Sequence, residues 1–196
     1  MNVVPIPLWN SHGVLPPVYP GYPGNSDFRS PFKVSLRDFL QQFSITLERR
    51  AILKGFLDYR SQLRAAGFTE GFQWVNGSFV ENVELLRGRA PNDIDVVTFL
   101  ALPQGETEES LEKKHPHLFD DEGIKQRFHT DSYYFFSGAD YSVKWIIDNT
   151  IYWYSMWAHQ RDSLTWKGFL EIDLASTIDE ELQKFLTMED MEGVKP

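Results

Sequence analysis

The sequence has no cysteine, no long apolar run and no excess of basic residues. The lack of cysteine excludes disulfide bonds, a catalytic thiolate and zinc sites with sulfur ligands. No segment approaches the roughly 18 consecutive apolar residues that a membrane-spanning helix needs. The 19 lysines and arginines are outnumbered by 28 aspartates and glutamates, which gives a net charge of −9. This charge argues against a broad nucleic-acid surface, but it is compatible with a local basic pocket for one nucleotide or one RNA end.

What is present is typical of a globular protein. The 196 residues suffice for one well-buried core but are few for two. Apolar residues make up 42% of the chain and aromatic residues 15%, which excludes the disordered class. The N-terminal segment lacks the basic and apolar regions of an export signal. We therefore expect a cytoplasmic protein that is not associated with a membrane.

Residues 1–32 are rich in proline and glycine and also contain large apolar side chains. Proline interrupts helices and is confined to the edges of sheets. A disordered tail is one interpretation of this composition, but apolar residues such as Trp9 and Leu15 are too frequent for it. We therefore expect an extended, proline-rich arm over residues 1–32, packed on a domain formed by residues 33–196.

Two helices are predicted at the start of that domain. Ser35 and Asp38 have the spacing of a capping box, which begins the first helix. Apolar residues recur with helical spacing over 45–66, and Gly67 follows at the position of a left-handed C-cap residue. The pattern predicts a long amphipathic helix over this second stretch.

The rest of the chain alternates between strands and helices. The composition and period predict strands over 72–75, 93–100, 128–136 and 167–174. The remaining predictions are a charged, exposed insertion over 103–123 and an amphipathic helix over 177–187. The aromatic residues of 141–158 suit a buried helix or a strand, and we favour a helix over 150–158. This order predicts a single α/β (α+β) domain with a mixed β-sheet flanked by helices.

The segment QWVNGSFVENVELLRGRAPNDIDVVTFL carries the candidate chemistry. Asp93 and Asp95 open a strand, and its two-residue period places them on one face, about 7 Å apart. Two such carboxylates repel each other unless divalent cations bind, and Mg²⁺ is usually held by carboxylates together with phosphate oxygens. Gly77 and Ser78 end the preceding strand, where glycine permits close backbone approach and serine offers a hydroxyl and an N–H to phosphate.

An Asp-x-Asp pair alone also arises on solvated faces, so the combination with the Gly-Ser turn matters. The combination resembles the signature of the DNA polymerase β-like nucleotidyltransferase superfamily. The similarity extends to a family of small bacterial nucleotidyltransferase-like proteins of unassigned function. The similar segments are HGVLPP (12–17), RR (49–50), WVNGSF (74–79), PNDIDVV (91–97), TDSYYFF (130–136) and YWYSMW…R…KG (152–168). The resemblance implies a five-stranded mixed sheet, a triphosphate-binding Gly-Ser turn and Mg²⁺ (or Mn²⁺) as the cofactor.

The resemblance also implies a third metal-binding carboxylate on a neighbouring strand. Asp131, at the start of a strand rich in aromatic residues, is the candidate, with Glu171 and Asp173 in reserve. Arg161 and Lys167 match the family's R…KG pattern and would neutralise phosphate charge, Arg161 in a bidentate manner. The alternative for both cations is an exposed turn without a ligand.

The gap between Ser78 and Asp93 is longer than the superfamily pattern. We interpret residues 83–89 (VELLRGR) as an insertion, which either loops outward or carries Arg87 and Arg89 over the phosphates.

Some large side chains have a structural interpretation. Only one of the adjacent Arg49 and Arg50 can face inward from a helix, and we expect it to be Arg50. Trp145, Trp153 and Trp157 are expected in the core rather than stacked on bases.

Three functions are compatible with this pattern. The first is Mg²⁺-dependent transfer of a nucleoside monophosphate from an NTP to an acceptor, with Asp93 and Asp95 binding metal and Asp131 helping to deprotonate the acceptor. The second is a catalytically silent module of the same fold that acts through a protein partner, such as a toxin–antitoxin or phage-defence component. The third is a metal-dependent phosphohydrolase. The pattern leaves open whether the acceptor is a protein, an RNA end or a small molecule, and which NTP is used.

Overall fold

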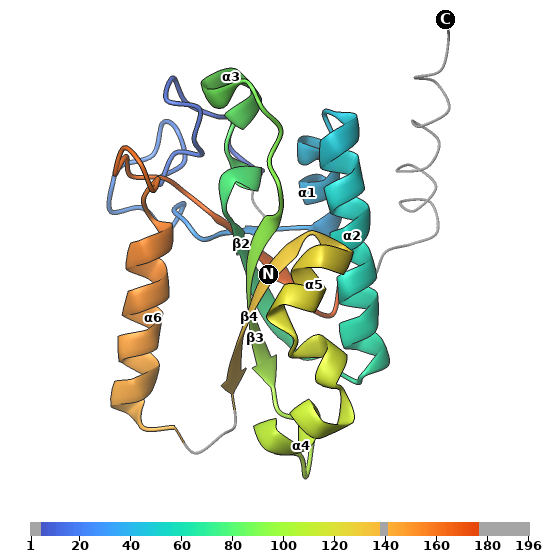
Figure 1. Cartoon of the computed structure of the whole chain (residues 1–196). Helices are drawn as coiled ribbons and strands as arrows, with labels where there is room; N and C mark the ends of the chain where they lie inside the picture. The colour runs from blue at the N-terminus through green and yellow to red at the C-terminus, as the bar shows by residue number, and fades with distance from the viewer. Residues whose placement is uncertain (1–4, 138–140, 177–196) are drawn as a thin grey trace, which may run out of the picture.

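A five-stranded mixed sheet forms the centre of the computed structural model, which describes residues 5–137 and 141–176 (Figure 1). The strands are β1 (Phe32–Val34), β2 (Gly71–Asn76), β3 (Ile94–Ala101), β4 (Thr130–Ser137) and β5 (Leu170–Asp173), in the order β1-β5-β2-β3-β4. Strand β2 is antiparallel to β3 and β5, whereas β3 and β4 are parallel, as are β1 and β5. The predicted α/β domain with a mixed sheet is confirmed.

Six α-helices accompany the sheet in the described residues. They are α1 (Leu36–Phe43), α2 (Leu47–Ala65), α3 (Val83–Arg87), α4 (Glu108–Lys114), α5 (Asp121–Phe128) and α6 (Val143–Trp157). Two 3₁₀ turns, η1 (Ser78–Val80) and η2 (Pro116–Leu118), complete the order. None of the helices described is long and apolar enough to cross a membrane.

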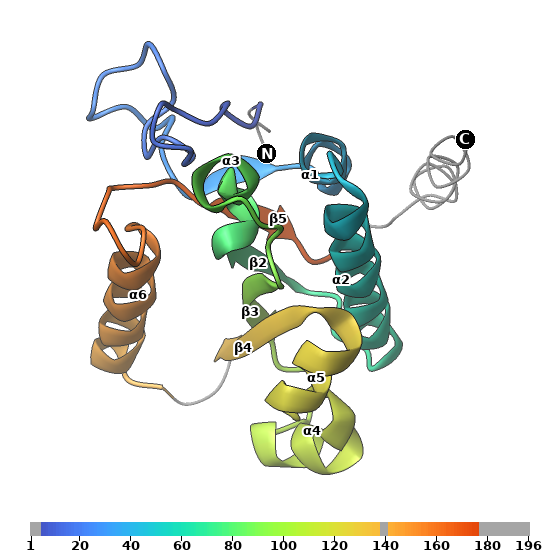
Figure 2. The same ribbon diagram turned by 45° about the horizontal axis from the view of Figure 1, so that its top comes forward.

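The helices cover both faces of the sheet. Figures 1 and 2 show α2 and α5 on one side and α6 on the other. The larger core lies on the α2 side, where side chains such as Phe56, Val75 and Val96 are fully buried. A smaller, mostly aromatic core lies between the sheet and α6 and includes Trp74, Val97, Phe135, Trp157 and Phe169. The face beneath α6 is also the face on which the candidate site lies.

The helix signals at the start of the domain behave as predicted. The Ser35 hydroxyl accepts a hydrogen bond from the Asp38 backbone N–H and donates one to its carboxylate at 2.6 Å, which caps α1. Helix α2 ends at Ala65, Ala66 is its C-cap residue, and Gly67 follows with a φ of +88°. The 103–123 insertion contains α4 and η2, and the helix expected at 150–158 begins earlier, at Val143. The helix predicted over 177–187 lies outside the described residues.

The predicted N-terminal arm is not supported. Residues 5–31 fold back through turns, with one isolated bridge between Val18 and Arg29, instead of running as an extended segment. Ile6 and Leu15 are buried in the larger core, and the Leu15 carbonyl accepts a hydrogen bond from Gly168, just before β5. Proline and glycine prevent regular structure here, but the apolar side chains between them are integrated into the core. The domain boundary at residue 32 stays a prediction.

Candidate metal centre

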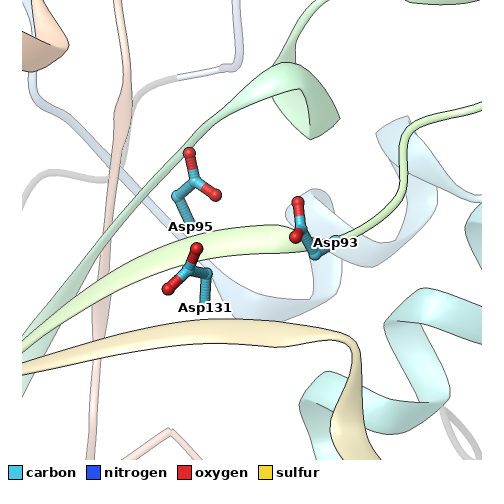
Figure 3. A group of neighbouring side chains, drawn as sticks. All are labelled: Asp93, Asp95 and Asp131. Carbon is cyan, nitrogen blue, oxygen red and sulfur yellow. The ribbon is translucent and has the colours of Figure 1, made fainter. Parts of the chain in front are cut away.

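Three aspartates meet at one end of the two adjacent parallel strands. Asp95 on β3 pairs in register with Asp131 on β4, and Asp93 lies just before β3. One carboxylate oxygen from each residue lies within 4.8 Å of the others, and all three side chains project to the same side of the sheet (Figure 3). Carboxylate oxygens at this spacing can converge on one hard divalent cation. The three aspartates form a cluster that could hold a divalent metal.

Burial and mutual repulsion perturb the cluster. Burial raises the pKa of the Asp95 carboxyl to about 6, and the neighbouring charges of Asp93 and Asp131 act in the same direction. A divalent cation would relieve both effects, because it favours the ionised carboxylate. The electrostatics of Asp95 therefore fit a cation ligand.

A lysine from α5 already contacts two of the three acids. The Lys125 Nζ lies 2.8 Å from Asp93 Oδ2 and 2.7 Å from Asp131 Oδ2. These hydrogen bonds raise the pKa of Lys125 above its usual range, so the side chain is a permanent cation. No ion pair or hydrogen bond to the Asp95 carboxylate occurs within the described part of the chain.

The turn after β2 faces Asp95. Gly77 has a φ of +80°, and a Cβ at this position would lie 2.6 Å from Asp95 Oδ2. Only glycine allows this close approach together with a positive φ. Ser78 follows directly and begins η1. The Gly-Ser turn thus lies directly against Asp95, one of the two predicted acids.

The turn and the three acids line one cavity of about 510 Å³. This volume is in the range of pockets for small molecules and cofactors. All the site residues predicted from sequence line it: Gly77, Ser78, Asp93, Asp95, Asp131, Arg161 and Lys167. The structure therefore brings these residues together, while their roles in binding or catalysis stay predictions.

Lys167 is a buried contact of the turn and not an exposed turn residue. Its Nζ lies 2.6 Å from Glu81 Oε1 and donates a hydrogen bond to the Gly77 carbonyl at 3.3 Å. Burial lowers the pKa of Lys167, and the adjacent Glu81 charge opposes that shift. Arg161, by contrast, is exposed at the cavity, with no partner among residues 5–137 and 141–176. Of the two predicted phosphate ligands, only Arg161 has a positive charge that is not paired with an acidic residue in the described part of the chain.

Glu81 was not identified from the sequence, although it organises this wall. The side chain is only 4% exposed and accepts hydrogen bonds from Lys167 and, at 2.9 Å, from Gln160 Nε2. A buried charge is tolerated only when it is paired in this way. The one signal in the sequence was an acidic residue directly after the apolar pair Phe79-Val80.

The prediction that Arg50 faces inward is wrong, because Arg49 is the buried arginine. Arg49 is fully buried and donates to the carbonyls of Phe79 and Glu81, each at 2.6 Å, and to both carboxylate oxygens of Glu84. Arg50 is partly exposed and bonds the Ser44 carbonyl at 2.9 Å. Arg49 therefore ties α2 to the segment after the Gly-Ser turn.

Helical spacing could have identified it. Arg49 lies four residues before Leu53 and seven before Phe56, both of which are fully buried, so it continues the apolar stripe of α2.

The 83–89 insertion lies beside the cavity. It forms α3, which is capped by Asn82 and ends at Gly88 in the left-handed conformation. Arg87 and Arg89 both line the cavity, where Arg87 is paired with Asp162 at 2.9 Å. Of the two interpretations of the insertion, the structure shows the one that carries arginines to the cavity.

The reserve carboxylates have other partners. Glu171 accepts a hydrogen bond from Trp74 Nε1 at 3.2 Å and lies 3.4 Å from Lys33 Nζ. Asp173 is exposed, and its Oδ1 accepts a hydrogen bond from Ala175. Neither residue lines the cavity. Asp131 is therefore the third carboxylate of the cluster.

Asn76 is a further buried polar residue at the cavity. It pairs in register with Asp95, so the row Asn76, Asp95 and Asp131 crosses three adjacent strands. Its Nδ2 donates to the Trp157 carbonyl at 3.0 Å, whereas its Oδ1 is buried without a partner. A buried acceptor without a partner is costly unless a ligand or water satisfies it. This unpartnered oxygen belongs to a residue that lines the cavity and lies next to Asp95.

A family model matches residues 7–173 of the chain. The chain belongs to DUF6932, a family of unknown function. The DUF6932 span contains all five strands and every residue that lines the cavity. No curated protein and no solved structure matches the chain. The chemistry of this DUF6932 protein is therefore argued from its own residues.

The tryptophans of α6 differ from the prediction. Trp157 is buried and Trp153 is partly buried, but Trp145 is 37% exposed, so it is not a core residue. Trp153 and Trp157 also form part of the cavity wall.

Proposed function

We propose that this DUF6932 protein is a Mg²⁺-dependent nucleotidyltransferase that transfers a nucleoside monophosphate from an NTP to an acceptor hydroxyl. The proposal is supported by one observation above all: the acid cluster and the Gly77-Ser78 turn line the same cavity, with Gly77 directly against Asp95. Three carboxylates suit a divalent cation, and a glycine-containing turn with exposed backbone groups suits phosphate. Each half occurs in many proteins, but their combination resembles the signature of the DNA polymerase β-like nucleotidyltransferase superfamily.

The cavity residues divide by charge into two groups. Asp93, Asp95 and Asp131 would hold Mg²⁺ or Mn²⁺, which supplies charge neutralisation at phosphate. Ser78 would bind phosphate through its hydroxyl and backbone N–H, while Arg161, which also lines the cavity, would neutralise phosphate charge. An NTP carries enough negative charge to require both groups.

The reaction balances with groups that the cavity contains. The acceptor oxygen forms a bond to the α-phosphorus, the bond from that phosphorus to the bridging oxygen breaks, and pyrophosphate leaves. The acceptor proton passes to a carboxylate, for which we propose Asp131, because it lies at the exposed edge strand β4 of the cluster.

The test is pyrophosphate release from each NTP in the presence of Mg²⁺ and candidate acceptors. Wild-type protein is expected to release pyrophosphate, and Asp95→Asn is expected to lose about 100-fold or more of this activity, because it removes a cation ligand. Asp58→Asn, an exposed acid on α2, is the matched control and should retain activity. Retained turnover in Asp95→Asn would contradict the assignment, and phosphate release without pyrophosphate would indicate a phosphohydrolase.

Asp95→Asn is also expected to be more stable than the wild type in EDTA near neutral pH. The folded pKa of Asp95 is raised above 3.8, so its ionisation destabilises the fold as pH rises from about 4 to 6, and the full cost persists above that range. Removing this charge should raise the free energy of unfolding by about 1–3 kcal/mol, since one pKa unit corresponds to about 1.4 kcal/mol. Urea denaturation measures the change and shows that lost activity is not lost folding.

A catalytically silent module that acts through a protein partner is the second candidate. It is favoured by the outer face of α6, where Ile147, Ile151 and Tyr152 are each at least 50% exposed. Exposed apolar side chains in a group often mark protein interaction sites. Calorimetry with Mg²⁺ and each NTP separates the two candidates: absent nucleotide binding, together with a stable partner in pull-downs, would favour the module.

A further inference from the structure

We infer that Lys125 takes the place of a second metal ion, so that the nucleotide-free cluster binds one divalent cation and not two. The inference deepens the proposed function and depends on its cation site. A cluster of three carboxylates has enough ligands for two ions in principle. The distribution of contacts within the cluster indicates that one of the two positions is filled by the protein itself.

The contacts of Lys125 are those of a bridging cation. Its ammonium lies 2.8 Å from an oxygen of Asp93 and 2.7 Å from an oxygen of Asp131, and it thus links two carboxylates from different segments. Charge-assisted hydrogen bonds of this length are strong. The Asp95 carboxylate, which lies in register with Asp131, is left without such a partner in the described residues. Asp95 is therefore the carboxylate that is left to bind a divalent cation.

The net charge of the cluster also indicates one bound divalent cation. Three carboxylates carry three negative charges, and Lys125 contributes one positive charge, which leaves two. Lys167, the other nearby ammonium, is already paired with Glu81 at 2.6 Å and does not change this sum. A single divalent cation would neutralise the cluster, whereas two would give it an excess of two positive charges before any nucleotide binds.

An independent observation indicates where the ion is received. Asn76 is 2% exposed, lines the cavity and pairs in register with Asp95, and its Oδ1 has no hydrogen-bond partner. An amide oxygen is a good ligand for a hard cation or for a water bound to it. Asn76 lies on β2, next to Asp95 and on the other side of β3 from Asp131.

The fold holds Lys125 in this position. It lies in the last turn of α5, and His129 ends that helix with a φ of +50° directly before β4. The end of α5 packs on α2 at Gly55, where a Cβ would lie 2.7 Å from the Phe128 carbonyl carbon. The backbone that follows Lys125 is therefore fixed against both the helix layer and the strand that carries Asp131.

The test is a Mn²⁺ titration of the nucleotide-free full chain, followed by electron paramagnetic resonance of the free ion. Wild-type protein is expected to bind one Mn²⁺ per chain, and Lys125→Met, which keeps the length of the side chain without its charge, is expected to bind two. Lys125→Arg keeps the charge and should bind one. Lys113→Met, an exposed lysine on α4 outside the cavity, is the matched control and should also bind one.

Two results would overturn the inference while leaving the proposed cation site intact. One is two Mn²⁺ ions per wild-type chain, which would mean that Lys125 moves aside. The other is a single ion in a folded Lys125→Met. No Mn²⁺ binding by the wild type would instead contradict the cation site as well. If Lys125→Met does not fold without metal, Lys125→Gln provides the same comparison, and the wild-type stoichiometry still decides.

Discussion

At the scale of single residues, the site depends on a contact between one glycine and one carboxylate. Gly77 leaves room for Asp95 only because it has no Cβ, and its positive φ turns the chain away after β2. The ionised form of Asp95 is destabilised by burial and by the two neighbouring acids, which raise the pKa of its carboxyl. A strained, charged arrangement of this kind is common where a protein keeps a function at the expense of stability.

Alanine substitutions at Gly77 and Gly105 distinguish the backbone strain of a Cβ at positive φ from its effect on the metal site. Gly77→Ala and Gly105→Ala each place a Cβ on a residue with a φ near +80°, so both should lower the free energy of unfolding by about 1–2 kcal/mol or more. Gly105 has nothing within 4 Å of that Cβ, whereas the Cβ at residue 77 would displace the Asp95 carboxylate. Only Gly77→Ala should therefore weaken Mn²⁺ binding, by about tenfold or more. Equal Mn²⁺ affinities in the two variants would contradict this role of Gly77.

Some of these residues could be predicted from the sequence, and others could not. Strand alternation was enough to place Asp93 and Asp95 on one face, because their positions depend only on local geometry. The buried state of Asn76 and Glu81 depends on partners about 80 residues away, Trp157 and Gln160, which no local pattern reveals.

At the scale of elements, the position of α5 connects the helix layer to the acid cluster. Lys125 reaches Asp93 and Asp131 because α5 ends directly before β4 and packs closely on α2. The close packing requires Gly55, since its Cβ would meet backbone atoms of Phe128. Backbone cannot rotate away as a side chain can, so this contact fixes the spacing of the two helices.

Gly55→Ala should therefore destabilise the protein, although alanine is the better helix former. Alanine gains about 1 kcal/mol in an exposed helix, but here the overpacking cost of about 1–3 kcal/mol and the forced movement of α5 exceed that gain. Ser61→Ala, at an exposed position of the same helix, should raise stability by a few tenths of a kcal/mol. Urea denaturation measures both variants. A Gly55→Ala protein as stable as Ser61→Ala would show that α5 does not pack as described.

Element prediction succeeded where the local signal was strong. The capping box at Ser35 and the apolar stripe of α2 gave the first two helices. The early start of α6 at Val143 was missed, because the apolar residues of this helix are also exposed on its outer face and give no clear periodicity. The 83–89 insertion could be seen as an anomaly of spacing, but its position beside the cavity follows from tertiary contacts such as the Arg49–Glu84 pair.

At the scale of the whole molecule, the sheet divides structural from chemical roles. The face toward α2 carries the larger core, and the face toward α6 carries the aromatic core and the row of Asn76, Asp95 and Asp131. The net charge of −9 coexists with arginines and acids that line the same cavity. Basic residues confined to a cavity suit a cation–nucleotide complex better than a long nucleic acid.

The overall architecture could be predicted, whereas the N-terminal segment could not. Alternating helix and strand signals lead to a mixed sheet by general packing rules. Ile6 and Leu15 instead enter the core through irregular turns, for which the sequence has no periodic signal.

The most direct test of the cation–nucleotide cavity is calorimetric titration with non-hydrolysable NTP analogues, in Mg²⁺ and again in EDTA. Binding is expected in Mg²⁺, with an affinity at least about tenfold weaker in EDTA and in Asp95→Asn, because the acids repel phosphate unless a cation lies between them. Equal affinity in Mg²⁺ and EDTA, or no binding of any of the analogues, would contradict the proposed site.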